Sequence, residues 1–146
     1  MKKIVLSFIT AMMLLTTAEL TEMSPQTQIK TAEAGSYGYS NPYYWGSCAY
    51  YAYQRRAQLG RPVGKYWGNA KNWAYNARRA GYTVRKAPRK GSVLVSQSGY
   101  YGHVAVVERI YSNGSILVSE MNYPRKGVKT YRSISKYQKS YYQYIY

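Results

Sequence analysis

The residues with the clearest capacity for covalent chemistry are one cysteine and one histidine. The sequence contains a single cysteine, Cys48, and a single histidine, His103. The thiolate is the nucleophilic form of cysteine, and a nearby histidine commonly takes up the thiol proton. Taken alone, the cysteine could equally be an intermolecular link or a buried small hydrophobe, and the histidine a packed or surface residue. The sequence around each residue has to distinguish these interpretations.

The position of Cys48 favours the reactive interpretation. Ser47 has a side chain typical of a helix N-cap, and residues 48–59 are predicted to form a helix that Gly60 and Pro62 close. Cys48 then lies in the first helical turn, where unpaired backbone N–H groups and the helix dipole stabilise an anion. This location is expected to lower the pKa of the thiol and to raise the fraction of thiolate.

His103 is predicted to begin a strand of a β-hairpin. Asn113-Gly114 is a strong hairpin signal between the predicted strands 103–111 and 115–123. A cysteine at a helix start, combined with a histidine on a following sheet, is the papain-type arrangement of nucleophile and base. The two residues therefore predict thiol-dependent acyl transfer.

A histidine base needs a polar side chain to orient its ring. Beyond residue 34 the chain offers only two carboxylates, Glu108 and Glu120. Side chains alternate between the two faces of a strand, so Glu108 is expected to point away from the face that carries His103. Glu120, on the second strand of the hairpin, remains as the carboxylate available for this role.

The predicted register of the hairpin leaves two orienting residues open. Across a two-residue turn, Val107 faces Glu120 and Ala105 faces Asn122, so both polar residues share the face of His103. The same register places Asn122 diagonal to His103 and Glu120 further along the strand. Strand alternation therefore supports Glu120 and Asn122 alike and does not rank them.

The remaining predicted elements define the fold class. A second helix is predicted over residues 70–80, because its apolar residues recur at helical spacing and a glycine follows. Further strands are predicted over residues 92–96, 128–134 and 141–146. Two helices followed by an antiparallel sheet form an α+β domain.

The first 34 residues have the organisation of a secretory signal peptide. Two lysines precede the apolar run 4–15, and the small-residue pattern Ala32-Glu33-Ala34 supplies a cleavage site. The apolar run is too short for a transmembrane helix, so no membrane span is expected. We therefore predict a signal peptide over residues 1–34, one domain over residues 35–146, and secretion of the product.

The predicted mature domain is strongly basic and rich in tyrosine. Residues 1–34 contain three of the 21 Lys and Arg residues and three of the 5 acidic residues, so the formal charge of +16 lies beyond them. All 20 tyrosines also lie beyond residue 34. A field of this sign attracts polyanions, and exposed tyrosine rings can pack on sugars.

Five short stretches carry a resemblance to a known family. In chain order they are Trp45-Gly46-Ser47-Cys48, Trp67-Gly68-Asn69-Ala70, Ala80-Gly81-Tyr82-Thr83-Val84, Tyr101-Gly102-His103-Val104-Ala105 and Val118-Ser119-Glu120-Met121-Asn122-Tyr123. At these residues the chain resembles the CHAP domain, the cysteine/histidine-dependent amidohydrolase/peptidase family, and within it the staphylococcal secretory antigen group. Together the stretches are highly specific and span nearly all of residues 35–146.

The resemblance implies a papain-like α+β fold, with N-terminal helices packed on an antiparallel β-sheet. It implies a secreted hydrolase that cleaves N-acetylmuramoyl-L-alanine or D-alanyl-glycyl amide bonds in bacterial peptidoglycan. It makes Cys48 the nucleophile, His103 the base, Glu120 the group that orients the imidazole and Asn122 a supporting polar residue. Glu120 ranks above Asn122 on this resemblance alone.

Two departures from the family pattern bear on the expected chemistry. Many relatives have glutamine just before the cysteine, where this chain has Ser47, so the backbone N–H of Cys48 is the expected oxyanion donor. Some phage relatives bind calcium through aspartates, and this chain contains no aspartate. We therefore expect no metal and no other cofactor.

The expected partners are peptidoglycan and anionic wall polymers, with no specific nucleic acid, and the expected oligomeric state is a monomer. One alternative is a non-catalytic cationic protein that binds walls or host molecules on a CHAP scaffold. Retention of all four polar site residues argues against it. A cationic antimicrobial or nucleic-acid-binding protein would also combine basic and aromatic residues, and that role does not exclude the hydrolase.

Overall fold

The computed structural model describes residues 41–146. The predicted signal peptide and the start of the predicted domain, residues 35–40, lie outside the described residues. The helices are α1 (Cys48–Gln58) and α2 (Trp73–Arg79), the latter preceded by the 3₁₀ turn η1 (Ala70–Asn72). The later elements are the strands β1 (Val84–Arg85), β2 (Val93–Ser96), β3 (His103–Ile110), β4 (Ile116–Met121), β5 (Lys129–Ile134) and β6 (Gln143–Ile145), with the 3₁₀ turn η2 (Lys139–Tyr141) before β6.

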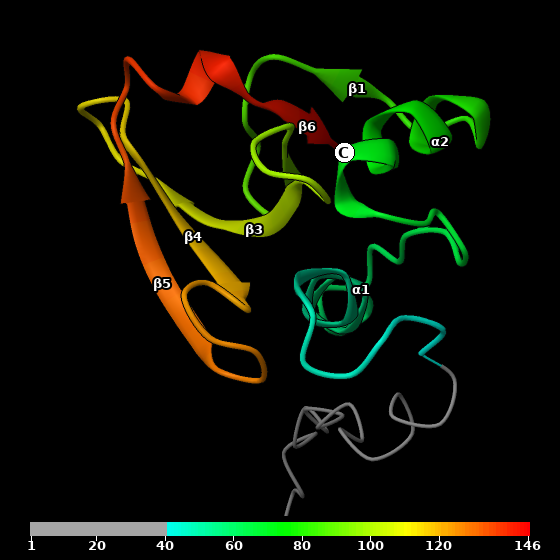
Figure 1. Cartoon of the computed structure of the whole chain (residues 1–146). Helices are drawn as coiled ribbons and strands as arrows, with labels where there is room; N and C mark the ends of the chain where they lie inside the picture. Colours follow the sequence, from blue (N-terminus) through cyan, green and yellow to red (C-terminus); the bar gives the residue numbers. More distant parts are fainter. Residues whose placement is uncertain (1–40) are drawn as a thin grey trace, which may run out of the picture. The chain divides into compact units, whose positions relative to one another are not determined.

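The strands form one six-stranded antiparallel sheet in the order β1-β6-β2-β3-β4-β5. Figure 1 shows that this sheet is strongly curved. Helix α1 packs on β3 and β4, whereas α2 packs on β6 and β1. The predicted papain-like α+β fold, with helices packed on an antiparallel sheet, is confirmed. The short elements β1 and η2 were not predicted, because neither is long enough to show a periodic pattern.

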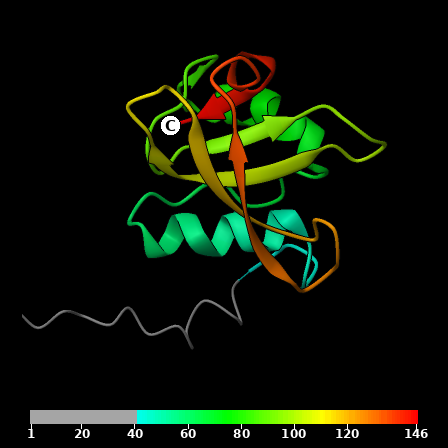
Figure 2. The ribbon, with the colours of Figure 1, turned by 90° about the vertical axis from the view of Figure 1, so that its left-hand side faces the viewer.

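Local interactions hold the start of α1 in place. Ser47 has an extended backbone, and its hydroxyl accepts a hydrogen bond from the Tyr50 N–H at 3.1 Å, as expected of an N-cap. Ala49 and Ala52 are buried between the helix and the sheet, and Figure 2 shows α1 running alongside the strands. The cap and the buried alanines together hold Cys48 at the first helical position. Within residues 41–146, no helix is long and apolar enough to cross a membrane.

Two apolar clusters lie on opposite faces of the sheet. The cluster on the helix side surrounds Trp73, which has no exposed surface and whose ring centroid lies 5.0 Å from that of Tyr43 and 5.5 Å from that of Trp67. Successive residues of the run 104–107 in β3 alternate between the two clusters. Both faces of this strand are therefore buried, which explains its continuous apolar sequence. The second cluster contains Leu94, Ala105, Val107, Ile116, Val118, Ile134 and Tyr144.

The loop of the β3–β4 hairpin is longer than predicted. The expected two-residue turn is wrong, because residues 112–114 form the loop between Tyr111 and Ser115, whose backbones are hydrogen bonded. Gly114 has φ 83°, and the Asn113 side-chain oxygen accepts a hydrogen bond from the Ser115 N–H at 2.9 Å. A left-handed glycine at the third position is typical of three-residue hairpin loops.

A β-bulge after Val107 shifts the register of the hairpin a second time. Val107 pairs with Val118, where the predicted register had Glu120, and continuing the observed register sets His103 opposite Asn122. Both predicted cross-strand pairs are therefore wrong. The longer loop alone would have turned Glu120 to the other face of the sheet, and the bulge returns it to the face of His103.

Replacing Trp73 by alanine is expected to lower the free energy of unfolding by about 3–5 kcal/mol, because it empties the centre of the helix-side cluster. Urea unfolding followed by circular dichroism measures this loss. The matched control is Tyr75→Ala on the same helix, whose side chain is 62% exposed. Its loss is expected to stay below about 1 kcal/mol. Equal losses in the two variants would contradict a central role for Trp73.

Candidate active site

Cys48 and His103 face one cleft from two different elements. Cys48 is the first residue of α1 and His103 is the first residue of β3, and these two elements pack on each other. The cleft has a volume of about 870 Å³. The structure therefore brings together the two residues whose types could carry out covalent chemistry. The aromatic residues that also line this cleft are Tyr43, Tyr44, Tyr100, Tyr101, Tyr123 and Tyr142.

Several hydrogen-bond donors surround the Cys48 sulfur. The His103 ring and the backbone N–H groups of Val104 and Ala49 lie near the sulfur and lower the pKa of the Cys48 thiol. Burial raises the pKa of Cys48, but hydrogen bonding and the positive charge of His103 outweigh burial, so the thiol pKa lies below its ordinary value. The Ala49 N–H belongs to the first turn of α1. Its contribution is the helix-start effect expected from the sequence.

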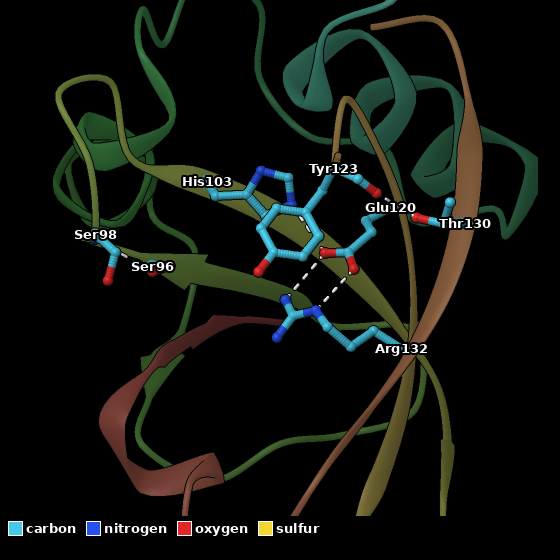
Figure 3. Close-up of polar contacts among 7 residues, drawn as sticks. All are labelled: Ser96, Ser98, His103, Glu120, Tyr123, Thr130 and Arg132. Carbon is cyan, nitrogen blue, oxygen red and sulfur yellow. Dashed lines mark hydrogen bonds and ion pairs between the residues drawn. The ribbon is translucent and has the colours of Figure 1, made fainter. Parts of the chain in front are cut away.

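Glu120 holds the His103 ring from the side away from the thiol. The ring Nε2 lies 2.9 Å from Oε2 of Glu120, whose side chain has no exposed surface (Figure 3). Because Nε2 is engaged, Nδ1 is the ring nitrogen left for the Cys48 thiol. Burial lowers the pKa of His103, but its hydrogen bonds to Cys48 and Glu120 outweigh burial and raise that pKa to about 9. The lowered pKa of Cys48 and the raised pKa of His103 together favour a thiolate beside an imidazolium.

Arg132 on β5 belongs to the same group of side chains, and the sequence analysis did not identify it. Figure 3 shows its guanidinium facing Glu120, with Nε donating to Oε1 at 2.8 Å and Nη2 donating to Oε2 at 3.0 Å. Burial raises the pKa of Glu120, but the hydrogen bonds from His103 and Arg132 outweigh burial and lower it. A buried carboxylate needs a cationic partner, so an arginine on the predicted neighbouring strand could have indicated this role for Arg132.

The position of Arg132 follows from the pairing of β5 with β4. Thr130 lies directly opposite Glu120 in this pair of strands. Arg132 is two residues further along β5, so it reaches the carboxylate along the diagonal between the strands. The side chain of Arg132 remains 29% exposed, whereas Glu120 is fully covered. The guanidinium therefore neutralises the carboxylate from the solvent side.

The Tyr123 ring lies over the outer side of this ion pair. Its centroid is 5.4 Å from that of the His103 ring and 5.0 Å from the guanidinium carbon of Arg132. The Thr130 hydroxyl donates to the Tyr123 carbonyl at 2.7 Å, and this bond ties the segment to β5 (Figure 3). The ring reduces the access of water to the charged groups beneath it.

The other two polar side chains considered in the sequence, Asn122 and Glu108, form no hydrogen bond with the His103 ring in residues 41–146. Asn122 lines the cleft just past the end of β4, with φ 61°, and is exposed. In the described part of the chain, no hydrogen bond joins it to His103. Glu108 faces α1, as strand alternation predicted, and accepts two hydrogen bonds from Arg55 at 2.8 Å and one from Ser119.

Few hydrogen-bond donors near the Cys48 sulfur could stabilise the oxyanion of a reacting carbonyl group. Ser47 uses its hydroxyl to cap α1. The backbone N–H of Cys48 at the helix start is the adjacent candidate oxyanion donor. Among residues 41–146, no group of three His, Cys, Asp or Glu side chains gathers into a metal-binding cluster.

Two curated and solved relatives are similar to this domain. N-acetylmuramoyl-L-alanine amidase Sle1 of Staphylococcus aureus (strain USA300) is 46% identical over 110 residues, which make up 75% of this chain and 33% of that protein. The crystal structure of N-acetylmuramoyl-L-alanine amidase from Staphylococcus aureus matches with a TM-score of 0.69 at 34% identity, covering 71% of this chain and 31% of the other. The chain thus spans about a third of the length of these amidases.

A more distant solved structure shares the same fold. The crystal structure of Ly7917 with the hydrolyzing product of MDP has a TM-score of 0.52 at 26% identity, covering 68% of this chain and 53% of the other. The family model described as CHAP domain matches residues 38–122, which is more than half of the chain. On this match, together with the cysteine–histidine cleft, the chain belongs to the CHAP domain family.

Proposed function

We propose that this protein is a cysteine amidase that cleaves the N-acetylmuramoyl-L-alanine bond of bacterial peptidoglycan. The proposal rests on the arrangement of three side chains. The Cys48 thiol has a lowered pKa and lines the same cleft as His103, and the buried carboxylate of Glu120 holds the His103 ring. A scaffold that only binds walls has no need of this arrangement. The choice of bond is supported by the similarity to proteins named N-acetylmuramoyl-L-alanine amidase.

In the proposed reaction, Cys48 and His103 start as thiolate and imidazolium. The sulfur attacks the carbonyl carbon of the amide, and the Cys48 N–H stabilises the oxyanion. As the C–N bond breaks, His103 donates its Nδ1 proton to the departing amine and a thioester remains. Neutral His103 then removes a proton from water, and the resulting hydroxide attacks the thioester. The product leaves as a carboxylic acid, which loses its proton to solvent, and the thiolate is restored beside the imidazolium.

Glu120 and Arg132 act behind the ring in this proposal. By accepting the Nε2 hydrogen bond, Glu120 keeps Nδ1 directed at the sulfur and stabilises the imidazolium. Arg132 is a positioning residue, because it keeps the buried carboxylate ionised and oriented. Asn122, at the edge of the cleft, serves as a supporting polar residue.

The walls of the cleft suit a substrate built from sugars and short peptides. Tyr44, Tyr100 and Tyr101 line it with exposed rings, which offer flat apolar faces to such groups. Export through the predicted signal peptide would deliver the enzyme outside the cell. Its positive charge would then attract it to anionic polymers of the wall.

Replacing Cys48 by alanine is expected to abolish release of soluble fragments from purified peptidoglycan, because the nucleophile is lost. Circular dichroism and wall pull-down are expected to match the wild type. Mass spectrometry of wild-type products locates the cut, since the proposed reaction frees the amino group of L-alanine, whereas a D-alanyl-glycyl cut frees that of glycine. Wild-type lysis by the variant would contradict the thiol mechanism, and wall binding without cleavage by the wild type would favour the non-catalytic alternative.

Glu120→Gln is expected to reduce turnover by about 10²-fold, the lower end of what acid–base catalysis contributes, because the ring loses its orienting charge. Release of dye from labelled peptidoglycan measures the rate per folded molecule. The matched control is Glu108→Gln, which removes the other carboxylate and is expected to retain activity within a few-fold. Asn122→Ala is also expected to retain most activity, and a larger loss there than in Glu120→Gln would make Asn122 the orienting residue.

The pKa of His103 can be measured directly, because the chain has no other histidine. NMR of its ring is expected to give a pKa of about 9 in the wild type. Glu120→Gln and Cys48→Ala should each lower this pKa, since each removes a group that stabilises the imidazolium. The imidazolium persists below the raised pKa and is lost above it, so kcat/KM should decline above about pH 9, and at lower pH in Glu120→Gln. A wild-type pKa near 6.5 would contradict the ion pair.

A further inference from the structure

A second cleft, lined by cations, lies toward the opposite end of α1 from Cys48. It has a volume of about 510 Å³, and it shares no lining residue with the cleft that contains Cys48. Arg56 lies in the last turn of α1, about 12 Å along the axis from Cys48 at the helical rise of about 1.5 Å per residue. The residues that line this second cleft are Arg56, Arg61, Pro62, Tyr82, Arg89, Lys90, Ser92 and Tyr146.

Arg56 is a buried cation with unused hydrogen-bond donors. Its side chain is only 2% exposed. Nε donates to the carbonyl of Arg61, and Nη1 donates to the carbonyls of Gly91 and Ile145, so the guanidinium ties three segments together. Within residues 41–146, Nη2 has no hydrogen-bond acceptor, and it is not among the fully enclosed unpaired atoms. Nη2 is therefore not fully enclosed, and Arg56 lines the second cleft.

Within residues 41–146, no acidic side chain forms an ion pair with these cations. Residues 41–146 contain two acidic residues, Glu108 and Glu120, and both are occupied in the ion pairs described above. Burial, together with the nearby charge of Arg61, lowers the pKa of Arg56 to about 10. A buried charge without a counter-charge is unfavourable, so an anion from outside the chain would relieve it.

Exposed cations surround the entrance to this cleft. The guanidinium of Arg89 lies 4.3 Å from the ring centroid of Tyr146, and Nη1 of Arg61 donates to the Lys90 carbonyl at 2.8 Å. These contacts hold the side chains in place before any ligand binds. A neighbouring hollow of about 510 Å³ shares Arg61 and Lys90 with this cleft, and its lining also contains Arg109 and the Arg55–Glu108 ion pair, so its cations outnumber its single carboxylate. Two adjacent basic hollows can accept successive anionic groups.

We propose that the second cleft is a binding site for a phosphate-class oxyanion, with Arg56 Nη2, Arg61 and Arg89 as its donors. Guanidinium groups match phosphate oxygens through paired, charge-assisted hydrogen bonds. Free phosphate and the phosphodiesters of a polymer share this chemistry, and the adjoining hollow gives a polymer additional contacts. The site binds rather than cleaves, so it is independent of the proposed hydrolase activity.

Isothermal titration calorimetry at constant ionic strength tests this site with inorganic phosphate and with poly(glycerol phosphate). The wild type is expected to bind the oxyanion, and tighter binding per phosphate for the polymer would assign the polymer as the source. The double variant Arg61→Gln/Arg89→Gln is expected to bind at least about tenfold more weakly, the effect of losing one charged hydrogen bond. The matched control is Arg78→Gln/Arg79→Gln, which has the same net charge and lines neither hollow.

Thermal unfolding supplies a second readout and checks the folding of each variant. Phosphate is expected to raise the Tm of the wild type and the control, because it binds only the folded protein, but not that of the cleft variant. The single variants Arg61→Gln and Arg89→Gln replace the double variant if it does not fold. If phosphate binding weakened equally in the cleft and control variants, diffuse electrostatic attraction would explain it and the proposed site would be wrong. Absence of phosphate binding to the wild type would also overturn the site. Hydrolysis of small peptidoglycan fragments should be unchanged in all variants, so failure of the proposed function leaves this test intact.

Discussion

The carboxylate of Glu120 has no exposed surface, yet it is ionised and carries two cationic partners. Removing a carboxylate from water is unfavourable unless its charge and its hydrogen-bonding capacity are both satisfied. His103 and Arg132 meet this requirement from β3 and β5, on either side of β4. The three strands must therefore keep their mutual register for the carboxylate to stay charged. The His103 ring is aimed at Cys48 by this constraint, and not by the hairpin alone.

The scarcity of acidic residues shapes the rest of the surface. Of the two acidic side chains in residues 41–146, Glu108 joins α1 to the sheet and Glu120 pairs with His103 and Arg132. Most basic residues consequently have no internal acid to pair with. Tyrosine rings take over part of this role through cation–π contacts, as where Lys126 lies 4.0 Å from the ring centroid of Tyr44. A basic domain rich in tyrosine can in this way order its cations while leaving them available to anions from outside.

The observed β3–β4 hairpin differs from the predicted one in two places, and the two differences offset each other on the face that carries Glu120. The predicted hairpin loop was one residue too short, and the bulge after Val107 was not anticipated. Each error alone reverses which face of β4 carries Glu120, so together they leave the face unchanged. The predicted pairing of individual residues was wrong, and Asn122 left the strand with a left-handed backbone. Glu120 therefore lies on the predicted face of β4, although the predicted register was wrong.

The sequence alone determined the α+β class, the capped helix that begins at Cys48 and the strand that begins at His103, because each of these depends on local interactions. Capping, periodicity and turn signals depend on residues a few positions apart, and they can be recognised without knowing the fold. Tertiary structure alone decided that Arg132 meets Glu120, and that Arg56 lies beside a carbonyl 89 positions away at Ile145. These contacts depend on loop length, a bulge and the order of strands in the sheet, because only the folded chain brings such distant side chains within hydrogen-bond distance.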